Sequence, residues 1–224
     1  MRRARTCLST WCVVPDVPRV TKGASKVTNP NPSVSYYLAQ SAAHMRRGLW
    51  ADERRLMDEA IRRFPDHPEI CIRTAVANAE FDASRSAIYA KRAADLAPSD
   101  PTILVRAASL LVGLGEVEMA GPLARRASEI VDEDFVLVAD LFHVIGRLGL
   151  ARENDDVAER YLRLAFNADP SGAGHGEVLA GFLVQRERLE EALDIVHRAL
   201  EEDPVHSEEL LRLHDVIIAA REPR

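Results

Sequence analysis

The stretch "EEALDIVHRALEEDP", residues 190–204, decides the fold class. It places small side chains at Ala192 and Ala199 and ends on Pro204, and a weaker copy ends at "YLRLAFNADP", residues 161–170. Small side chains seven residues apart lie on one face of a helix, two turns apart, so neighbouring helices can approach closely. Proline then ends the helix because it lacks an N–H and disfavours helical geometry in the residue before it. The stretch therefore predicts a closely packed helix that occurs more than once.

The same spacing fits the chain five times. Alanines recur at gaps of 33, 34, 38 and 34 residues, which is the mark of a repeat protein. Seven residues before each alanine the residue is mostly small, and five residues after it stands Pro65, Pro98, Asp132, Pro170 or Pro204. An apolar helical segment precedes each copy, and Gly48, Asp82, Gly115 or Gly149 separates it from the second helix. Each unit is predicted to be a helical hairpin, with these small residues at the helix contacts: Ala60, Ala93, Ala120, Ala127, Ala158, Ala165, Ala192 and Ala199.

The composition favours an all-α protein. Of the 224 residues, 47% are hydrophobic but only 5% are aromatic, so the core must consist largely of Ala, Leu, Val and Ile. Apolar residues recur at spacings of three and four after about residue 34, and runs with period two are scarce. These features suit closely packed helices.

The charge is distributed unevenly along the chain. The net charge is -6, yet residues 1–33 carry six basic groups and one acid, for +5, which leaves -11 on the remainder. An acidic body argues against a surface that follows nucleic-acid phosphates, because such binding needs clustered cations. We expect no nucleic-acid partner.

Neither catalysis nor metal binding is indicated. The chain has no phosphate-binding loop, no HExxH and no GxSxG motif, and its acidic cluster around residues 153–156 lacks the ligand spacing of a calcium loop. His206 and His214 have no third ligand nearby, and Cys71 has no basic partner. We predict a protein that is not an enzyme and that has no cofactor and no metal site.

The cysteines and the hydropathy point to a cytoplasmic protein. Cys7, Cys12 and Cys71 form neither an even disulfide framework nor a CxxC pair, so we expect reduced thiols. No run of 18 apolar residues exists, so no membrane insertion is expected.

The repeated positions resemble the tetratricopeptide repeat (TPR) family. The copy at residues 173–204 matches the large, small and proline positions of the family motif through Leu179, Ala180, Leu183, Ala192, Ala199 and Pro204. The copy at residues 101–134 matches through Leu104, Ala107, Ala108, Leu111, Gly115, Ala120 and Ala127. The resemblance covers about residues 34–221 and implies a right-handed α-solenoid of about five hairpins with a C-terminal capping helix.

The domain boundaries follow from the repeat. We expect a flexible basic tail at 1–33, units at about 34–66, 67–99, 100–134, 135–172 and 173–206, and a polar-backed capping helix at 207–221. Pro122 should delay or kink the second helix of the third unit, and Gly174, Gly176 and Gly181 should weaken the first helix of the fifth. The fourth unit has four extra residues, predicted as a longer loop within the hairpin around "LARENDDV", with Asn154 or Asp155 as the next helix cap.

The resemblance also implies a binding surface. In this family the first helices line a concave groove for an extended or helical peptide of another protein. The corresponding residues, mostly apolar, are Leu38, Ala42, Met45, Ile72, Arg73, Val76, Ala79, Val105, Arg106, Ser109, Val112, Ala139, His143 and Gly146. The alternative is that these residues pack against adjacent hairpins.

The function expected from this surface is a protein–protein interaction scaffold or adaptor that binds an apolar or amphipathic segment. The alternative is a regulatory domain or subunit of an enzyme or signalling system. In that case the basic tail, with Trp11, Val13, Val14 and Val17, would occupy the groove as an intramolecular regulator.

Overall fold

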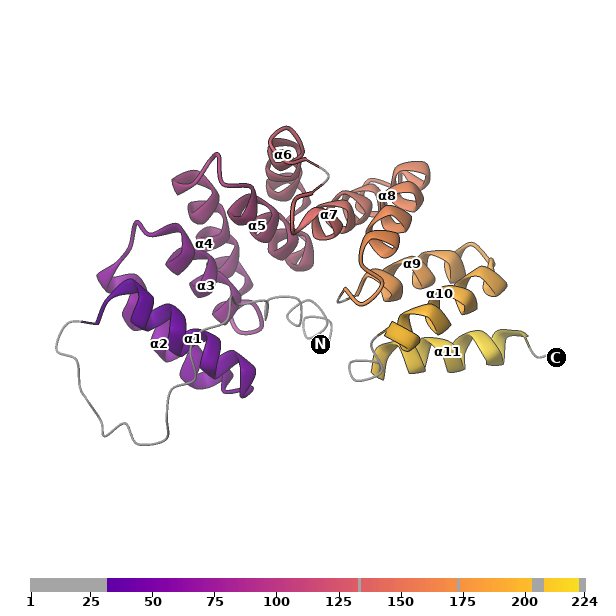
Figure 1. The fold of residues 1–224 in the computed structure, drawn as a ribbon, viewed down its shortest axis with the longest axis horizontal. Helices are drawn as coiled ribbons and strands as arrows, with labels where there is room; N and C mark the ends of the chain where they lie inside the picture. Colours follow the sequence, from indigo (N-terminus) through magenta and orange to yellow (C-terminus); the bar gives the residue numbers. More distant parts are fainter. Residues whose placement is uncertain (1–31, 133, 173, 203–207, 222–224) are drawn as a thin grey trace. The chain divides into compact units, whose positions relative to one another are not determined.

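The computed structural model describes residues 32–132, 134–172, 174–202 and 208–221 (Figure 1). The described residues form eleven α-helices and no strand, which confirms the all-α prediction. Except for Pro32 and Ser33, the predicted tail lies outside them. The chain divides into two compact units, Met1–Pro98 and Ser99–Arg224, each with its own set of helices.

The first unit contains two helical hairpins. Its helices are α1 (Val34–Arg46), α2 (Trp50–Arg63), α3 (Pro68–Asn78) and α4 (Ala83–Leu96), and α2 also packs against α3 (Figure 1). The Ser33 hydroxyl accepts a hydrogen bond from the Tyr36 N–H at the start of α1, and the Asp82 carboxylate accepts one from the Arg85 N–H at the start of α4. These caps satisfy N–H groups that have no partner inside a helix. Gly48, with φ +66°, supplies the left-handed turn between α1 and α2.

The second unit contains three hairpins and a final helix. Its helices are α5 (Pro101–Leu114), α6 (Val117–Ser128), α7 (Val138–Ala151), α8 (Asp155–Ala168), α9 (His175–Gln185), α10 (Leu189–Glu202) and α11 (Glu208–Arg221). Gly115 ends α5 with φ +84°, as expected of a helix-ending glycine. The Asn154 side chain accepts from the Val157 N–H, which confirms it as the cap of α8. A shared core of Leu162, Phe166, Leu183 and Ile217 joins α8 to α11.

The eight small residues of the repeat are all buried. Two glycines have the same steric role. A Cβ on Gly149 would lie 2.8 Å from the Ala158 backbone nitrogen, and one on Gly176 would lie 2.8 Å from the Ala199 Cβ. Gly149 was expected in a turn but lies inside α7, where it lets α8 approach closely. Gly176 likewise lets α9 approach α10, so its cost in helix propensity is offset by packing.

Two local expectations need correction. Helix α6 begins at Val117 and includes Pro122, so of the two expected effects of the proline, a delayed start or a kink, the delayed start does not occur. The connection inside the fourth hairpin is only residues 152–154, whereas residues 129–137 separate α6 from α7. The extra length therefore lies between the third and fourth hairpins rather than within the fourth.

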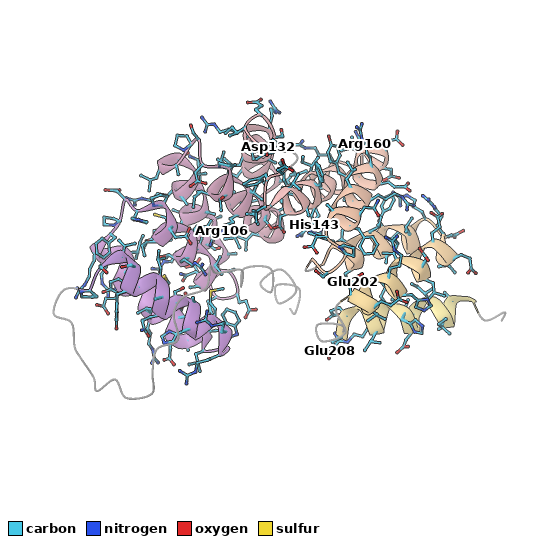
Figure 2. All side chains as sticks on the ribbon, viewed as in Figure 1. Arg106, Asp132, His143, Arg160, Glu202 and Glu208 are labelled. Carbon is cyan, nitrogen blue, oxygen red and sulfur yellow. The ribbon has the colours of Figure 1, made fainter. Side chains whose placement is uncertain are left out.

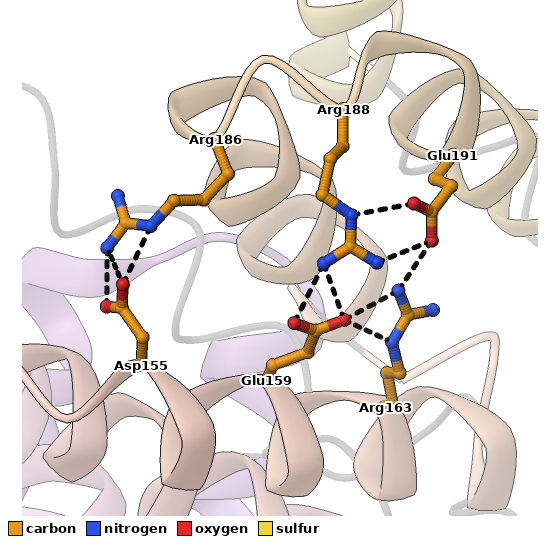
Figure 3. Close-up of polar contacts among 6 residues, drawn as sticks. All are labelled: Asp155, Glu159, Arg163, Arg186, Arg188 and Glu191. Carbon is orange, nitrogen blue, oxygen red and sulfur yellow. Dashed lines mark hydrogen bonds and ion pairs between the residues drawn. The ribbon is translucent and has the colours of Figure 1, made fainter.

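An ion-pair network holds α8 against the α9–α10 hairpin (Figure 3). The Glu159 carboxylate accepts hydrogen bonds from Arg163 at 2.9 Å and from Arg188 at 2.8 Å. Both guanidinium groups also donate to Glu191, at 2.8 Å and 2.6 Å, while Arg186 pairs with Asp155 beside them. The three acids and three arginines form a charge-balanced contact between the fourth and fifth hairpins.

Among the helices that the structure describes, none combines the length and the low polarity needed to cross a lipid bilayer.

Candidate functional site

The residues predicted to line a groove lie on α1, α3, α5 and α7 or directly after α3, the first helices of successive hairpins. On each helix three of them are spaced i, i+4 and i+7, as in Ile72, Val76 and Ala79, so they share one face. Figure 2 labels Arg106 on α5 and His143 on α7. The set is thus divided between the two compact units.

Burial divides the set further. Leu38, Ala79, Arg106 and Ser109 are partly exposed. The other members are buried: Ala42, Met45, Ile72, Arg73, Val76, Val105, Val112, Ala139, His143 and Gly146. A buried side chain offers a partner little surface, so only the four partly exposed residues are accessible for direct contact.

A buried polar cluster lies beneath the predicted surface of the first unit. Glu53 of α2 is 1% exposed and occupies a position where the repeat has a small residue. Its Oε1 accepts a hydrogen bond of 2.6 Å from Ser41, and its Oε2 lies 3.9 Å from His44 Nδ1. Burial raises the pKa of Glu53 because it disfavours the charged form, and the Ser41 hydrogen bond opposes that shift. The sequence carried a signal for this cluster, because Glu53 is an acid at a repeat position that is otherwise mostly small.

Arg73 is held by its neighbours rather than presented to a partner. Its Nε donates to Glu69 Oε1 at 3.1 Å, and a terminal nitrogen contacts Met45 Sδ at 3.1 Å. Both contacts lie in the first unit, and Arg73 is 8% exposed. Arg73, one of the two arginines predicted on this surface, therefore links α3 to α1.

In the second unit the structure pairs a predicted residue with one that the sequence did not indicate. The rings of His143 on α7 and His175 on α9 lie 4.8 Å apart, centroid to centroid. Burial first, then His175 and Arg147, lower the pKa of His143 well below its usual value. No spacing in the sequence relates positions 143 and 175, which meet only because two hairpins pack together.

Several large apolar side chains are exposed outside the predicted surface. Ile88 on α4 is 65% exposed and Val136, before α7, is 84% exposed. Helix α11 was expected to carry a polar outer face, yet it exposes Leu211, Val216 and Ile218. Its inner face packs Ile217 into the core.

The described residues hold no group of three or more His, Cys, Asp or Glu side chains placed to bind a metal ion. Cys71 is buried, its Sγ donates to the Pro65 carbonyl oxygen at 3.4 Å, and burial raises the pKa of the thiol. A raised pKa disfavours the thiolate, which is the nucleophilic form. Cys71 therefore serves as a small core residue.

Solved structures share this arrangement of hairpins. TTC0263, a thermophilic TPR protein of Thermus thermophilus, aligns with a TM-score of 0.69 at 18% identity, over 83% of this chain and 100% of that one. The chain has the TPR fold. PilF of Pseudomonas aeruginosa aligns at 0.61 and 15% identity, over 83% of this chain and 85% of PilF. A MamA RS-1 double mutant aligns at 0.55 and 18% identity, over 81% and 96% of the two chains.

At these identities the likeness establishes the TPR fold and nothing of the partner. No family model matches the chain, and no curated protein matches its sequence. The TPR hairpins account for all the described helices except α11.

Proposed function

We propose that this chain is a non-catalytic scaffold or adaptor that binds another protein through the first helices of its TPR hairpins. The observation that carries the proposal is that α1 and α5, and Ala79 directly after α3, offer partly exposed residues beside buried apolar ones. Such faces suit an apolar or amphipathic segment, which presents its own residues at intervals of three and four. The TPR fold supports binding over catalysis.

The contact residues differ between the two units. In the first unit Leu38 and Ala79 are accessible, and in the second Arg106 and Ser109 are. Leu38 and Ala79 offer apolar contact, whereas Ser109 adds a hydroxyl that can donate or accept a hydrogen bond. We infer that each unit offers its own contact residues to a partner, while Ile72 of α3 and Val105 of α5 are buried.

The test is quantitative affinity capture from an extract of the cells that produce the protein, with the full chain as bait. Ala79→Glu and Ser109→Glu each place a charge on the proposed surface at a partly exposed position. Ile88→Glu and Val136→Glu are matched controls, because both residues are largely exposed elsewhere. Circular dichroism verifies that all four variants fold.

The proposal is supported if both controls capture a partner as the wild type does while at least one surface variant captures about tenfold less of it. A tenfold loss corresponds to about 1.4 kcal/mol of binding free energy. Equal capture by all five proteins would exclude these first-helix faces as the binding surface. Capture of no protein by the wild-type chain would contradict a scaffold function.

A further inference from the structure

The contact between His143 and His175 joins the first helices of the fourth and fifth hairpins. His143 is 6% exposed and His175 is 0% exposed, and their rings are tilted by 40°. Both residues lie in the second unit. Imidazole gains and loses a proton near neutral pH, so a contact between two buried histidines can respond to pH.

The hydrogen bonds fix one tautomer. Nδ1 of His175 lies 3.0 Å from the Asp169 carbonyl oxygen, which only accepts hydrogen bonds, so Nδ1 carries a proton. In neutral His175, Nε2 is then unprotonated and has no hydrogen-bond partner. A Cβ on Gly172 would overlap the His175 ring, so the α8–α9 connection closes tightly over it. His143 Nδ1 is also buried without a hydrogen-bond partner.

The surrounding charges treat the two rings differently. Asp140 Oδ1 lies 3.6 Å from His175 Nε2 and would compensate a proton there. The groups that act on the charge of His143 are His175 and Arg147, and both oppose a positive charge. Burial, and then Glu209 of α11, raise the pKa of Glu177 on α9. Among the described residues, no carboxylate forms an ion pair or a hydrogen bond with His143, whereas Asp140 contacts His175.

The neighbouring segments carry further charged groups, including Asp169, whose carboxylate accepts hydrogen bonds from Ser171 and lies near His175. Helix α5 contributes only Arg106, and the charged residues of α6 are exposed. In α8, Asp155, Glu159 and Arg163 are paired within the network of Figure 3, and Asp156 and Arg160 are exposed. The charged residues of α10 and His197 are exposed, and in α11 Arg212 pairs with Glu208 and Glu209 while His214 lies beside Asp215.

We propose that His143 and His175 form a proton-sensitive joint between α7 and α9, which holds while His143 is neutral and opens when His143 takes a proton. A protonated His143 would be a buried cation without an ion-pair partner, packed against the ring of His175. Separation of α9 from α7 would expose both rings to water. The joint is independent of the proposed binding function, since it concerns packing within the second unit.

The direction of the pH effect follows from linkage. The folded pKa of His143 lies well below the unfolded value near 6.5. The separated form therefore binds a proton more readily than the packed form. The stability due to neutral His143 is complete above about pH 6.5 and declines as the pH falls below it. One proton changes the opening equilibrium by up to about tenfold per pH unit in that window.

Glu53 gives the first unit the opposite response. Its pKa is raised in the folded chain, so the folded form takes up the proton more readily than the unfolded form. Acidification towards its unfolded value near 4.5 therefore adds stability to α1 and α2. The two units of one chain provide an internal comparison.

The experiment is hydrogen exchange followed by mass spectrometry on the full chain at pH 7.5 and pH 5.0, with rates corrected for intrinsic exchange. We expect protection of residues 175–185 to fall by about tenfold or more at pH 5.0, while residues 50–63 lose none. His143→Leu and His143→Gln remove the titrating ring and should abolish the fall. His197→Gln alters the pair of His197 on α10 and His214 on α11, whose rings lie 5.5 Å apart, and should keep the fall in protection.

Undiminished protection of residues 175–185 at pH 5.0 in the wild-type chain would overturn the proposal. The proposal would also be overturned if a folded His143 variant lost as much protection of residues 175–185 at pH 5.0 as the wild type. A loss of the pH response in His197→Gln would assign the effect to α10 and α11 instead.

Discussion

At the scale of single residues, two close contacts between helices depend on glycines, which have no side chain. Gly149 and Gly176 stand where a Cβ would meet Ala158 or Ala199 at 2.8 Å. Gly181, by contrast, lies within α9 with nothing within 4 Å of its Cβ position. Glycine therefore favours stability at position 149, where it permits close packing, and disfavours it at position 181, where it only lowers helix propensity.

Gly149→Ala should destabilise the chain by about 1–3 kcal/mol, because the added methyl meets the backbone of α8, which cannot shift without moving the helix. Gly181→Ala should be neutral or stabilise by up to about 1 kcal/mol, since alanine favours a helix interior. Denaturant unfolding of both variants beside the wild type measures the difference. Equal stability of the two variants would show that α7 and α8 do not approach as described.

At the scale of helices, the ion-pair network of Figure 3 adds charge interactions to the apolar packing between the fourth and fifth hairpins. Glu159 and Glu191 each receive two guanidinium groups, from Arg163 and Arg188. The hydrogen bond from Arg188, then that from Arg163, lower the pKa of Glu191 to about 2. Planar guanidinium groups suit this bridging because each presents several donors in a fixed geometry.

Arg188→Gln should raise the midpoint of Glu191 towards the ordinary glutamate value, because the variant loses the largest cause of the shift. Carbon-detected NMR titration of the side-chain carboxyls measures the midpoint of Glu191 in the wild type and in the variant. With a depressed folded pKa, the contribution of Glu191 to stability is present above about pH 4.5 and is lost as the pH falls towards 2. A wild-type midpoint near 4.5 would mean that the bridge does not persist in solution.

At the scale of the whole chain, charge separates the first 33 residues, at +5, from the remainder, at -11. Opposite charges on one chain attract over about 10 Å at 0.1 M salt, and the effective concentration of a tethered segment is high. This asymmetry is the observation behind the alternative function, in which the tail competes with a partner for the first-helix surface.

Deletion of residues 1–33 should then increase the affinity for a captured partner by about threefold to tenfold, equivalent to roughly 0.7–1.4 kcal/mol. The gain should shrink as salt rises, because screening weakens the competitor. Titration calorimetry at two salt concentrations measures both effects, with an Arg2→Gln, Arg3→Gln, Arg5→Gln chain as the charge control. An unchanged affinity would exclude the tail as a competitor.

The helical architecture was predictable because its signals are local. Helix period, small residues seven apart and prolines after Arg63, Leu96 and Ala168 all act within a few turns of one chain segment. The misplaced insertion near the fourth hairpin shows the limit. Extra residues can be counted from the spacing of the repeat, but whether they lie within or between hairpins depends on where α7 packs.

The candidate surface was predictable in position but not in exposure. Residues 72, 76 and 79 share a helix face by spacing alone, yet which of them reaches solvent depends on the neighbouring helices. The sequence by itself determined the repeat, the all-α class and the helix faces. Only the tertiary structure decided the burial of Glu53, the network around Glu159 and the contact of His143 with His175, because each requires side chains from different helices to meet, and inter-helix register is set by packing rather than by local pattern.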